Sequence, residues 1–156
     1  MNQEIIETYG NRLRLRVCAL CIKGDSLLMV KHTGVADVPV WLPPGGGVER
    51  NEPAQEALRR EMMEETGLVI NNIAFAFVCE LIKPPLHAVE LFFTADYTQP
   101  SIVKGYDPEV QTQVIEAVEW MHFNEIVHLS PNARHGIFNI GIHPSEILSL
   151  RGFYQI

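Results

Sequence analysis

The chain of 156 residues has few features of secreted, membrane or nucleic-acid-binding proteins. It contains three cysteines, an odd number that does not form a disulfide framework. The longest early apolar run, residues 17–22, is too short to cross a bilayer. The N-terminus is polar and acidic, whereas a secretory signal needs a basic start followed by an apolar stretch. We therefore expect a cytoplasmic protein that does not enter a membrane.

Basic residues are also scarce, because 12 Lys and Arg stand against 19 Asp and Glu, a formal net charge of −7. Duplex nucleic-acid binders normally carry a basic field, so no such partner is expected. An acidic protein can still bind a small phosphorylated nucleotide if a cation or a few arginines line the site. The length, with 47% hydrophobic and 20% charged residues, predicts a single globular domain over residues 1–156. The oligomeric state stays open, a homodimer included.

The pattern of apolar residues and turns predicts a mixture of strands and helices. Strands are expected at residues 13–21, 26–32, 73–82, 87–97 and 114–121, helices at 53–66 and 123–129, and one or two short helices after residue 130. Several hairpins and the helices beside them make an α/β protein with a mixed β-sheet the expected fold class. In the first strand the odd positions from Leu13 to Cys21 are apolar, so this face is expected to be buried.

Cys18 and Cys21 have a spacing that also occurs in metal-binding and redox pairs. On a strand, an offset of three residues places the two side chains on opposite faces of the sheet. Reduced thiols in the core are therefore the preferred interpretation, and metal or redox chemistry is the alternative.

A loop rich in proline and glycine precedes the first long helix. Pro43 to Gly47 contains two prolines and three glycines, which exclude regular structure and allow the backbone to approach a metal or a phosphate. Proline suits the first turn of the helix at 53–66, and Gly67 suits its C-terminal cap.

Three carboxylates share one ridge of this helix. Glu61, Glu64 and Glu65 stand at positions i, i+3 and i+4, where like charges destabilise a helix by a few tenths of a kcal/mol per pair. A hard divalent cation would relieve this repulsion, and oxygen ligands suit Mg²⁺ or Mn²⁺. The alternative is an acidic face that only contacts solvent.

A longer motif surrounds these glutamates. Gly46 is followed by five residues, Glu52, seven residues, and then Arg60-Glu61-Met62-Met63-Glu64-Glu65-Thr66-Gly67-Leu68. This segment resembles the Nudix box at all nine of its specified positions. One departure is Pro53, where relatives often have a serine or threonine cap. The resemblance covers about 15% of the chain and identifies it as a member of the Nudix hydrolase family.

The resemblance implies an α/β/α sandwich and Mg²⁺-dependent hydrolysis of a nucleoside diphosphate linked to another moiety, with Mn²⁺ as the alternative ion. It implies that Glu61, Glu64, Glu65 and the Gly46 carbonyl bind the metal. It also implies a salt bridge between Arg60 and Glu52 that fixes the loop, so these two residues complete the catalytic set.

The general base differs among family members, which use either the glutamate equivalent to Glu61 or a glutamate on a later loop. Glu109 and Glu116 are the candidates for a later base in this chain, and ordinary surface positions are the alternative for both.

The substrate is less well defined by the sequence. Arg12, Arg14 and Arg16 alternate along the first strand, and Arg14 and Arg16 are our candidates for binding phosphate groups; a solvated strand face is the alternative. Pro84 lies 16 residues after Leu68, and a proline at about this distance resembles the pattern of the ADP-ribose-specific subgroup of the family. A plain turn also uses proline. We expect ADP-ribose or a nucleotide sugar, with nucleoside triphosphates as the alternative.

Aromatic residues on the later strands could stack a base, but their alternation suits a core better. They are Phe75, Phe77, Phe92, Phe93 and Tyr97. Two non-enzymatic functions also remain open, a nucleotide sensor that kept the fold and an acidic helix that binds another protein. The complete set of box glutamates argues against a sensor.

Overall fold

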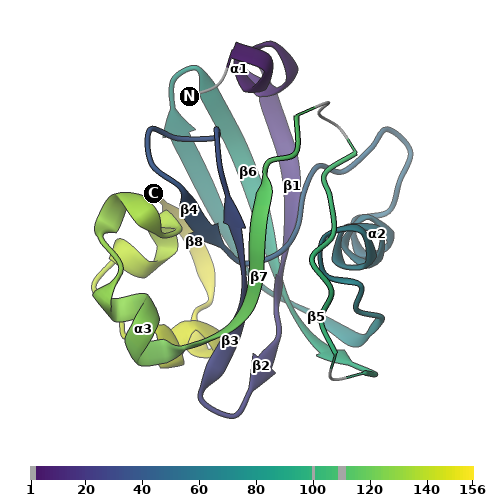
Figure 1. Cartoon of the computed structure of the whole chain (residues 1–156), viewed down its shortest axis with the longest axis vertical. Helices are drawn as coiled ribbons and strands as arrows, with labels where there is room; N and C mark the ends of the chain where they lie inside the picture. Colours follow the sequence, from purple (N-terminus) through teal and green to yellow (C-terminus); the bar gives the residue numbers. More distant parts are fainter. Residues whose placement is uncertain (1–2, 100, 109–111) are drawn as a thin grey trace.

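The computed structural model describes residues 3–99, 101–108 and 112–156, and Figure 1 shows how their strands and helices are arranged. The helices are α1 (Gln3–Tyr9), α2 (Ala54–Thr66) and α3 (Phe123–His128), followed by the short 3₁₀ helices η1 (Pro131–Ala133), η2 (Gly136–Asn139) and η3 (Pro144–Ser149). The strands are β1 (Leu13–Leu20), β2 (Ile22–Lys23), β3 (Ser26–His32), β4 (Val40–Leu42), β5 (Ile70–Lys83), β6 (Leu86–Tyr97), β7 (Ile115–His122) and β8 (Gly152–Gln155).

The strands form two four-stranded sheets. In the first, the order is β1-β6-β5-β8; β1 runs parallel to β6 and β8 parallel to β5, while β5 and β6 form an antiparallel hairpin. In the second, β3 pairs antiparallel with β2, β4 and β7. The first sheet contains parallel and antiparallel pairs, so the expected α/β fold with a mixed sheet is confirmed.

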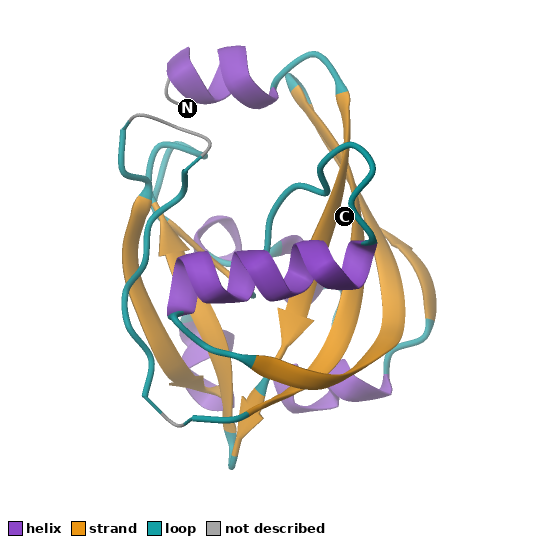
Figure 2. Ribbon diagram, turned by 90° about the vertical axis from the view of Figure 1, so that its right-hand side faces the viewer, coloured by secondary structure: helices purple, strands orange, loops and turns teal. Residues whose placement is uncertain are grey.

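Helices lie on both sides of these strands. Helix α2 crosses one side (Figure 2), where its Leu58 and Met62 share a core with Val17, Leu28 and Phe93. On the other side α3, η2 and η3 share a second core, whose members include Leu27, Phe77, Phe92, Ile126 and Phe138. Two layers of helix around the strands make the α/β/α sandwich.

The ends of α2 follow from the residues around it. The helix begins at Ala54, one residue later than expected, because Pro53 has extended geometry with φ −64° and ψ 140°. No side chain caps this end. At the other end Gly67 has a left-handed conformation with φ 69°, and its N–H donates to the carbonyl of Met63, as expected for a glycine cap.

The first half of β1 is oriented opposite to our prediction. Leu13 and Leu15 are 64% and 45% exposed, whereas Arg14 and Arg16 on the other face are partly buried. Farther along the strand, Val17 and Ala19 are fully buried in the core that contains α2. The expected burial of the odd positions is therefore right only where α2 covers the strand.

The three cysteines are free and buried. Cys18 belongs to the core on the α3 side and Cys21 to the core on the α2 side, which confirms that they lie on opposite faces as reduced core thiols. Burial raises the pKa of Cys21 to about 12. Among the described helices, none combines the length and apolar character needed to cross a membrane.

Several short elements have no counterpart in the sequence prediction. Strand β8 pairs with β5, although only helices were expected after residue 130. Helix α1, too, was not expected; it buries Ile5 and Tyr9. Both elements bring terminal segments toward the cleft described below, which Tyr9 and Ile156 help to line.

Candidate active site

The glycine-rich loop runs along the edge of β1. The N–H groups of Val17 and Ala19 donate to the carbonyls of Gly46 (3.0 Å) and Pro44 (2.8 Å). Gly45 has φ +146°, and a Cβ there would overlap the carbonyl of Val17. A Cβ on Gly46 would overlap the carboxylate of Glu61. Glycine is therefore needed at both positions, because only its backbone fits between β1 and α2.

Two of the three ridge glutamates are buried against this loop. Glu61 is 6% exposed and Glu65 is 4% exposed. Oε2 of Glu65 accepts a hydrogen bond of 2.8 Å from the N–H of Gly45. Burial, and next the charge of Glu61, raise the pKa of Glu65 well above its usual range. The two carboxylates thus form a site where a bound cation would remove a large electrostatic penalty.

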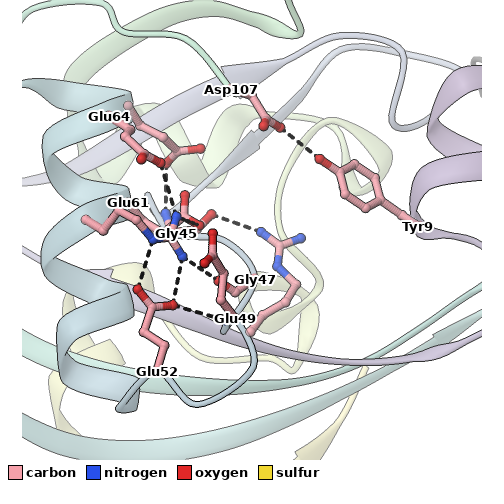
Figure 3. A network of polar contacts seen from close by, with 11 residues as sticks. Tyr9, Gly45, Gly47, Glu49, Glu52, Glu61, Glu64 and Asp107 are labelled. Carbon is pink, nitrogen blue, oxygen red and sulfur yellow. Dashed lines mark hydrogen bonds and ion pairs between the residues drawn. The ribbon is translucent and has the colours of Figure 1, made fainter. Parts of the chain in front are cut away.

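Arg60 joins the loop to the ridge through polar contacts with Gly47, Glu52, Glu61 and Glu64, which are labelled in Figure 3. Its Nε and Nη2 donate to the two oxygens of Glu52, each at 3.0 Å, and Nη2 also donates to the carbonyl of Gly47 at 2.9 Å. Its Nη1 donates to Glu61 at 2.8 Å and Glu64 at 3.1 Å. The hydrogen bonds from Arg60 lower the pKa of Glu52. Arg60 therefore holds the loop and two glutamates in one arrangement.

The side chains present could supply only some of the oxygen ligands of an ion such as Mg²⁺. Within the described ranges, no three His, Cys, Asp or Glu side chains are grouped so that they could hold a metal by themselves. Mg²⁺ is usually held by one or two carboxylates together with waters and substrate phosphates. Glu61, Glu65 and the Gly46 carbonyl, which has a second lone pair beside the one used by Val17, match that donor set.

A cleft of about 300 Å³ opens beside these groups. Its lining includes Glu61, Glu65, Gly45 and Gly46, and also Arg14, Arg16, Lys83, Glu90 and His135. The Arg14 guanidinium lies 3.9 Å from the centroid of the Tyr9 ring, and the Tyr9 hydroxyl donates to Asp107 at 3.1 Å. In Figure 3, Tyr9 and Asp107 lie farther from α2 than the polar contacts around Glu52, Glu61 and Glu64. The cleft thus combines acidic groups with basic ones.

The structure separates the three arginines of the predicted stripe. Arg14 and Arg16 line the cleft, whereas Arg12 is exposed and is not part of its lining. Nη2 of Arg16 donates to the carbonyl of Gly45 at 3.1 Å, so this arginine touches the glycine loop itself.

The structure describes only one of the two glutamates that were candidates for a later general base. Glu116 lies on β7, outside the cleft lining, and forms an exposed ion pair of 2.6 Å with Lys31. Glu109 lies outside the described residues.

Sequence reasoning missed Asp107, which does line the cleft. Its charge also contributes to the raised pKa of Glu65, after burial and Glu61. An acidic residue just before a proline in a loop was the only signal available for it.

His32 of β3 is a second cleft residue that the sequence did not indicate. Its Nε2 lies 3.6 Å from Oε1 of Glu65, and the side chain is buried. Burial, and next the charge of Arg16, lower the pKa of His32 to about 3. The ring is therefore neutral at neutral pH.

The aromatic residues expected in the core do not line the cleft in the part of the chain that the structure describes. Phe77 and Phe92 stack in the core with their ring centroids 4.6 Å apart. Phe75 is 57% exposed, so its expected place in the core was wrong. Its ring packs edge-on against Phe93 at the margin of the α2 side. Pro84 lies in the turn between β5 and β6, also outside the cleft lining.

The chain is similar to known hydrolases in sequence. The NUDIX domain family matches residues 12–140. An NAD-capped RNA hydrolase, NudC, of Photorhabdus laumondii is 28% identical over 110 residues, which cover 70% of this chain and 39% of the relative. A GDP-mannose pyrophosphatase of Yersinia enterocolitica is 31% identical over 88 residues, 56% of this chain and 45% of the relative. The chain thus spans less than half the length of these relatives.

The fold is also similar to that of solved structures. A MutT NUDIX hydrolase from Burkholderia pseudomallei superposes with a TM-score of 0.63 at 23% identity, over 72% of this chain and 85% of that one. This likeness confirms the expected fold, and the family match covers well over half of the chain. The chain therefore belongs to the NUDIX domain family.

Proposed function

We propose that this domain uses Mg²⁺ to hydrolyse the diphosphate bond of a nucleoside diphosphate linked to another moiety, with ADP-ribose or a nucleotide sugar as the favoured substrates. The observation that supports this most is the pairing of two buried carboxylates, Glu61 and Glu65, with Arg14 and Arg16 in one cleft. A diphosphate needs both a divalent cation and basic groups around its oxygens.

The acidic residues would hold the cation. Glu61, Glu65 and the Gly46 carbonyl are its ligands in this proposal, together with water and substrate oxygens. Glu64, which accepts a hydrogen bond from Arg60, would join them by turning toward the ion. A bound Mg²⁺ would neutralise the diphosphate and lower the pKa of a water molecule. Arg60 keeps Glu61 and Glu64 aligned, and its two hydrogen bonds to Glu52 keep the loop against the helix. These residues therefore pre-organise the site before substrate arrives.

The basic residues would hold the substrate. Arg14 and Arg16 bind phosphate oxygens in this proposal. A cleft of about 300 Å³ is at the small end of the usual range for ligand sites, which suits a nucleotide diphosphate better than a folded nucleic acid.

The relatives support the type of bond more than any one substrate. Their names include an NAD-capped RNA hydrolase, an 8-oxo-dGTP diphosphatase and a GDP-mannose pyrophosphatase. NAD, dGTP and GDP-mannose differ in the attached moiety but share a phosphoanhydride bond.

A substrate panel tests the proposal. The purified protein is incubated with Mg²⁺ in ¹⁸O water, separately with ADP-ribose, GDP-mannose, NAD and 8-oxo-dGTP. The products are then identified by mass spectrometry. We expect at least one member of the panel to give a nucleoside monophosphate and a second phosphorylated product, with label on the attacked phosphorus. Glu65→Gln protein purified in parallel excludes a contaminating hydrolase.

The opposite result would be calorimetric binding of these nucleotides with no product after long incubation in Mg²⁺ or Mn²⁺. That result would contradict hydrolysis and favour the nucleotide sensor.

A further inference from the structure

A buried acid on the basic side of the cleft has no role in the function proposed above. Glu90 of β6 is 2% exposed, and His135, at the start of η2, is 5% exposed. Their Oε2 and Nε2 atoms lie 2.8 Å apart, although the two residues are 45 positions apart in the chain. Burying a carboxylate is costly unless it has hydrogen bonds and charge partners, and an apolar pair would often be as stable.

The neighbours of His135 define which of its nitrogens carries the proton. The N–H of Ile137 donates to Nδ1 of His135 at 3.2 Å, so Nδ1 acts as an acceptor. Nε2 therefore carries the hydrogen and donates it to Glu90. The Phe92 ring packs edge-on against the imidazole, with centroids 5.4 Å apart, and restricts its rotation. His135 thus fixes the carboxylate through one oxygen.

The second oxygen of Glu90 faces Arg16. Oε1 lies 3.6 Å from Arg16 Nε, which is too long for a hydrogen bond but close for opposite charges. Nη2 of the same guanidinium donates to the carbonyl of Gly45, the residue before the proposed metal ligand Gly46. Arg16 is therefore held from two sides, by the glycine loop and by Glu90.

The charge states agree with this arrangement. Burial acts to raise the pKa of Glu90, but His135, Arg16 and Arg14 together lower it to about 2. Burial also acts to lower the pKa of Arg16, and Glu90 is the largest opposing influence, so the net pKa is raised. At neutral pH both groups are ionised.

One buried donor of this arginine is left without a hydrogen bond. Arg16 Nε is shielded from solvent and has no hydrogen-bond partner, whereas the side chain as a whole is 17% exposed and lines the cleft. Apart from its hydrogen bond to Gly45, the guanidinium is therefore oriented by the charge of Glu90, and its exposed part faces the cleft.

We propose that Glu90 and His135 are positioning residues that hold Arg16 in the orientation needed to bind an oxygen of the substrate's diphosphate. This inference takes from the proposed function only that the ligand contains a diphosphate; it does not require that the diphosphate is hydrolysed. His135 makes binding of the substrate depend on the C-terminal segment, which the Nudix box does not include.

The test compares binding of ADP, which carries a diphosphate, with binding of adenosine, which does not. Both affinities are measured by calorimetry in Mg²⁺ on wild-type protein and on Glu90→Gln, which keeps the shape and an acceptor for His135 but removes the charge. We expect ADP to bind about tenfold more weakly and adenosine to bind unchanged. With the substrate found in the panel, KM should rise about tenfold while kcat changes less.

Glu80→Gln is the matched control. Glu80 also accepts a hydrogen bond from a histidine, His87 at 3.0 Å, on the same β5–β6 hairpin, but neither residue lines the cleft. We expect no change in ADP affinity for this variant. His135→Gln, which can still donate to Glu90, should lose less ADP affinity than His135→Leu.

Two further measurements separate positioning from a general structural role. In Arg16→Lys protein, adding Glu90→Gln should cause much less additional loss of ADP affinity than it does in wild-type protein, because its effect passes through Arg16. The ¹⁵N resonance of Arg16 Nε, assigned by its loss in Arg16→Lys, should shift in Glu90→Gln and on addition of ADP.

Three results would overturn the inference. The first is wild-type ADP affinity in folded Glu90→Gln protein, and the second is an equal loss of ADP and adenosine binding. The third is an absence of ADP binding to the wild type at millimolar concentration. If ADP binding depends on Glu90 as expected but the panel yields no product, the inference stands and the proposed hydrolysis fails.

Discussion

The acidic part of the cleft comes, apart from Asp107, from one short stretch of chain, whereas the basic part comes from three distant ones. Residues 45–65 supply the glycine loop, Arg60 and the ridge glutamates. Arg14 and Arg16 come from β1, Glu90 from β6 and His135 from the C-terminal segment. Spacing along one helix is enough to bring Arg60 and the ridge glutamates together, but only the folded chain brings Arg14, Arg16, Glu90 and His135 together.

The two parts also differ in how their charge is balanced. On the acidic side Glu61 and Glu65 are buried together, and burial and mutual repulsion raise the pKa of Glu65. On the basic side Arg16 and Glu90 balance each other within the protein. In the proposed function a cation relieves the repulsion between Glu61 and Glu65, whereas the charge of Arg16 is already balanced by Glu90 within the protein.

The largest expected effect comes from removing a charge on the acidic side. Glu64→Gln and Glu65→Gln should each lower kcat by at least about a hundredfold, because metal ligands matter at least as much as the groups that orient them. Circular dichroism melts should show that both variants fold. Unchanged turnover in both would remove the metal site from the account.

The glycine loop should be nearly as sensitive, for a steric reason. Gly46→Ala places a methyl group where the Glu61 carboxylate lies, so we expect turnover to fall at least about tenfold and stability to fall by about 1–3 kcal/mol. Gly141→Ala is the control, because its positive φ of 91° adds strain but no atom lies within 4 Å of the new Cβ. If both variants lose turnover equally, crowding of Glu61 is not the cause.

The ion pair between Glu90 and Arg16 on the basic side should make the free energy of unfolding depend on pH in the acid range. The pKa of Glu90 falls from 4.5 to about 2 on folding, so its contribution is present above pH 4.5 and is lost as the pH falls toward 2. At 1.36 kcal/mol per pKa unit this contribution is about 3 kcal/mol.

Urea unfolding of wild-type and Glu90→Gln protein between pH 7 and pH 2.5 measures this contribution. The difference in the free energy of unfolding should be greatest at pH 7 and should shrink below pH 4.5. A difference that stays constant with pH would show that Glu90 contributes by shape alone.

The smallest effect is expected outside both parts. Glu116→Gln removes an exposed ion pair with Lys31, which is worth at most about 1 kcal/mol. Turnover should stay within twofold of the wild type in a steady-state assay. A loss of a hundredfold would mean that Glu116 reaches the substrate as a general base after all.

The same division explains what the sequence could predict. Helix α2 and its glycine cap depend on residues close in the chain, so spacing and local propensity were enough to predict them. The Arg60–Glu52 contact was predicted only from the resemblance to the Nudix box. The orientation of Leu13 and Arg14 was predicted wrongly, because alternation along a strand does not tell which face a helix covers. Asp107 and His135 gave no usable signal, since their roles depend on contacts with Tyr9 and Glu90.

One measurement tests the central claim most directly. Crystals soaked in Mn²⁺ and ADP should show an anomalous difference peak within coordination distance of Glu61, Glu65 and the Gly46 carbonyl, with diphosphate oxygens on the Arg16 side of the metal. Crystals that contain ADP in the cleft but show no anomalous peak beside these oxygens would contradict the account.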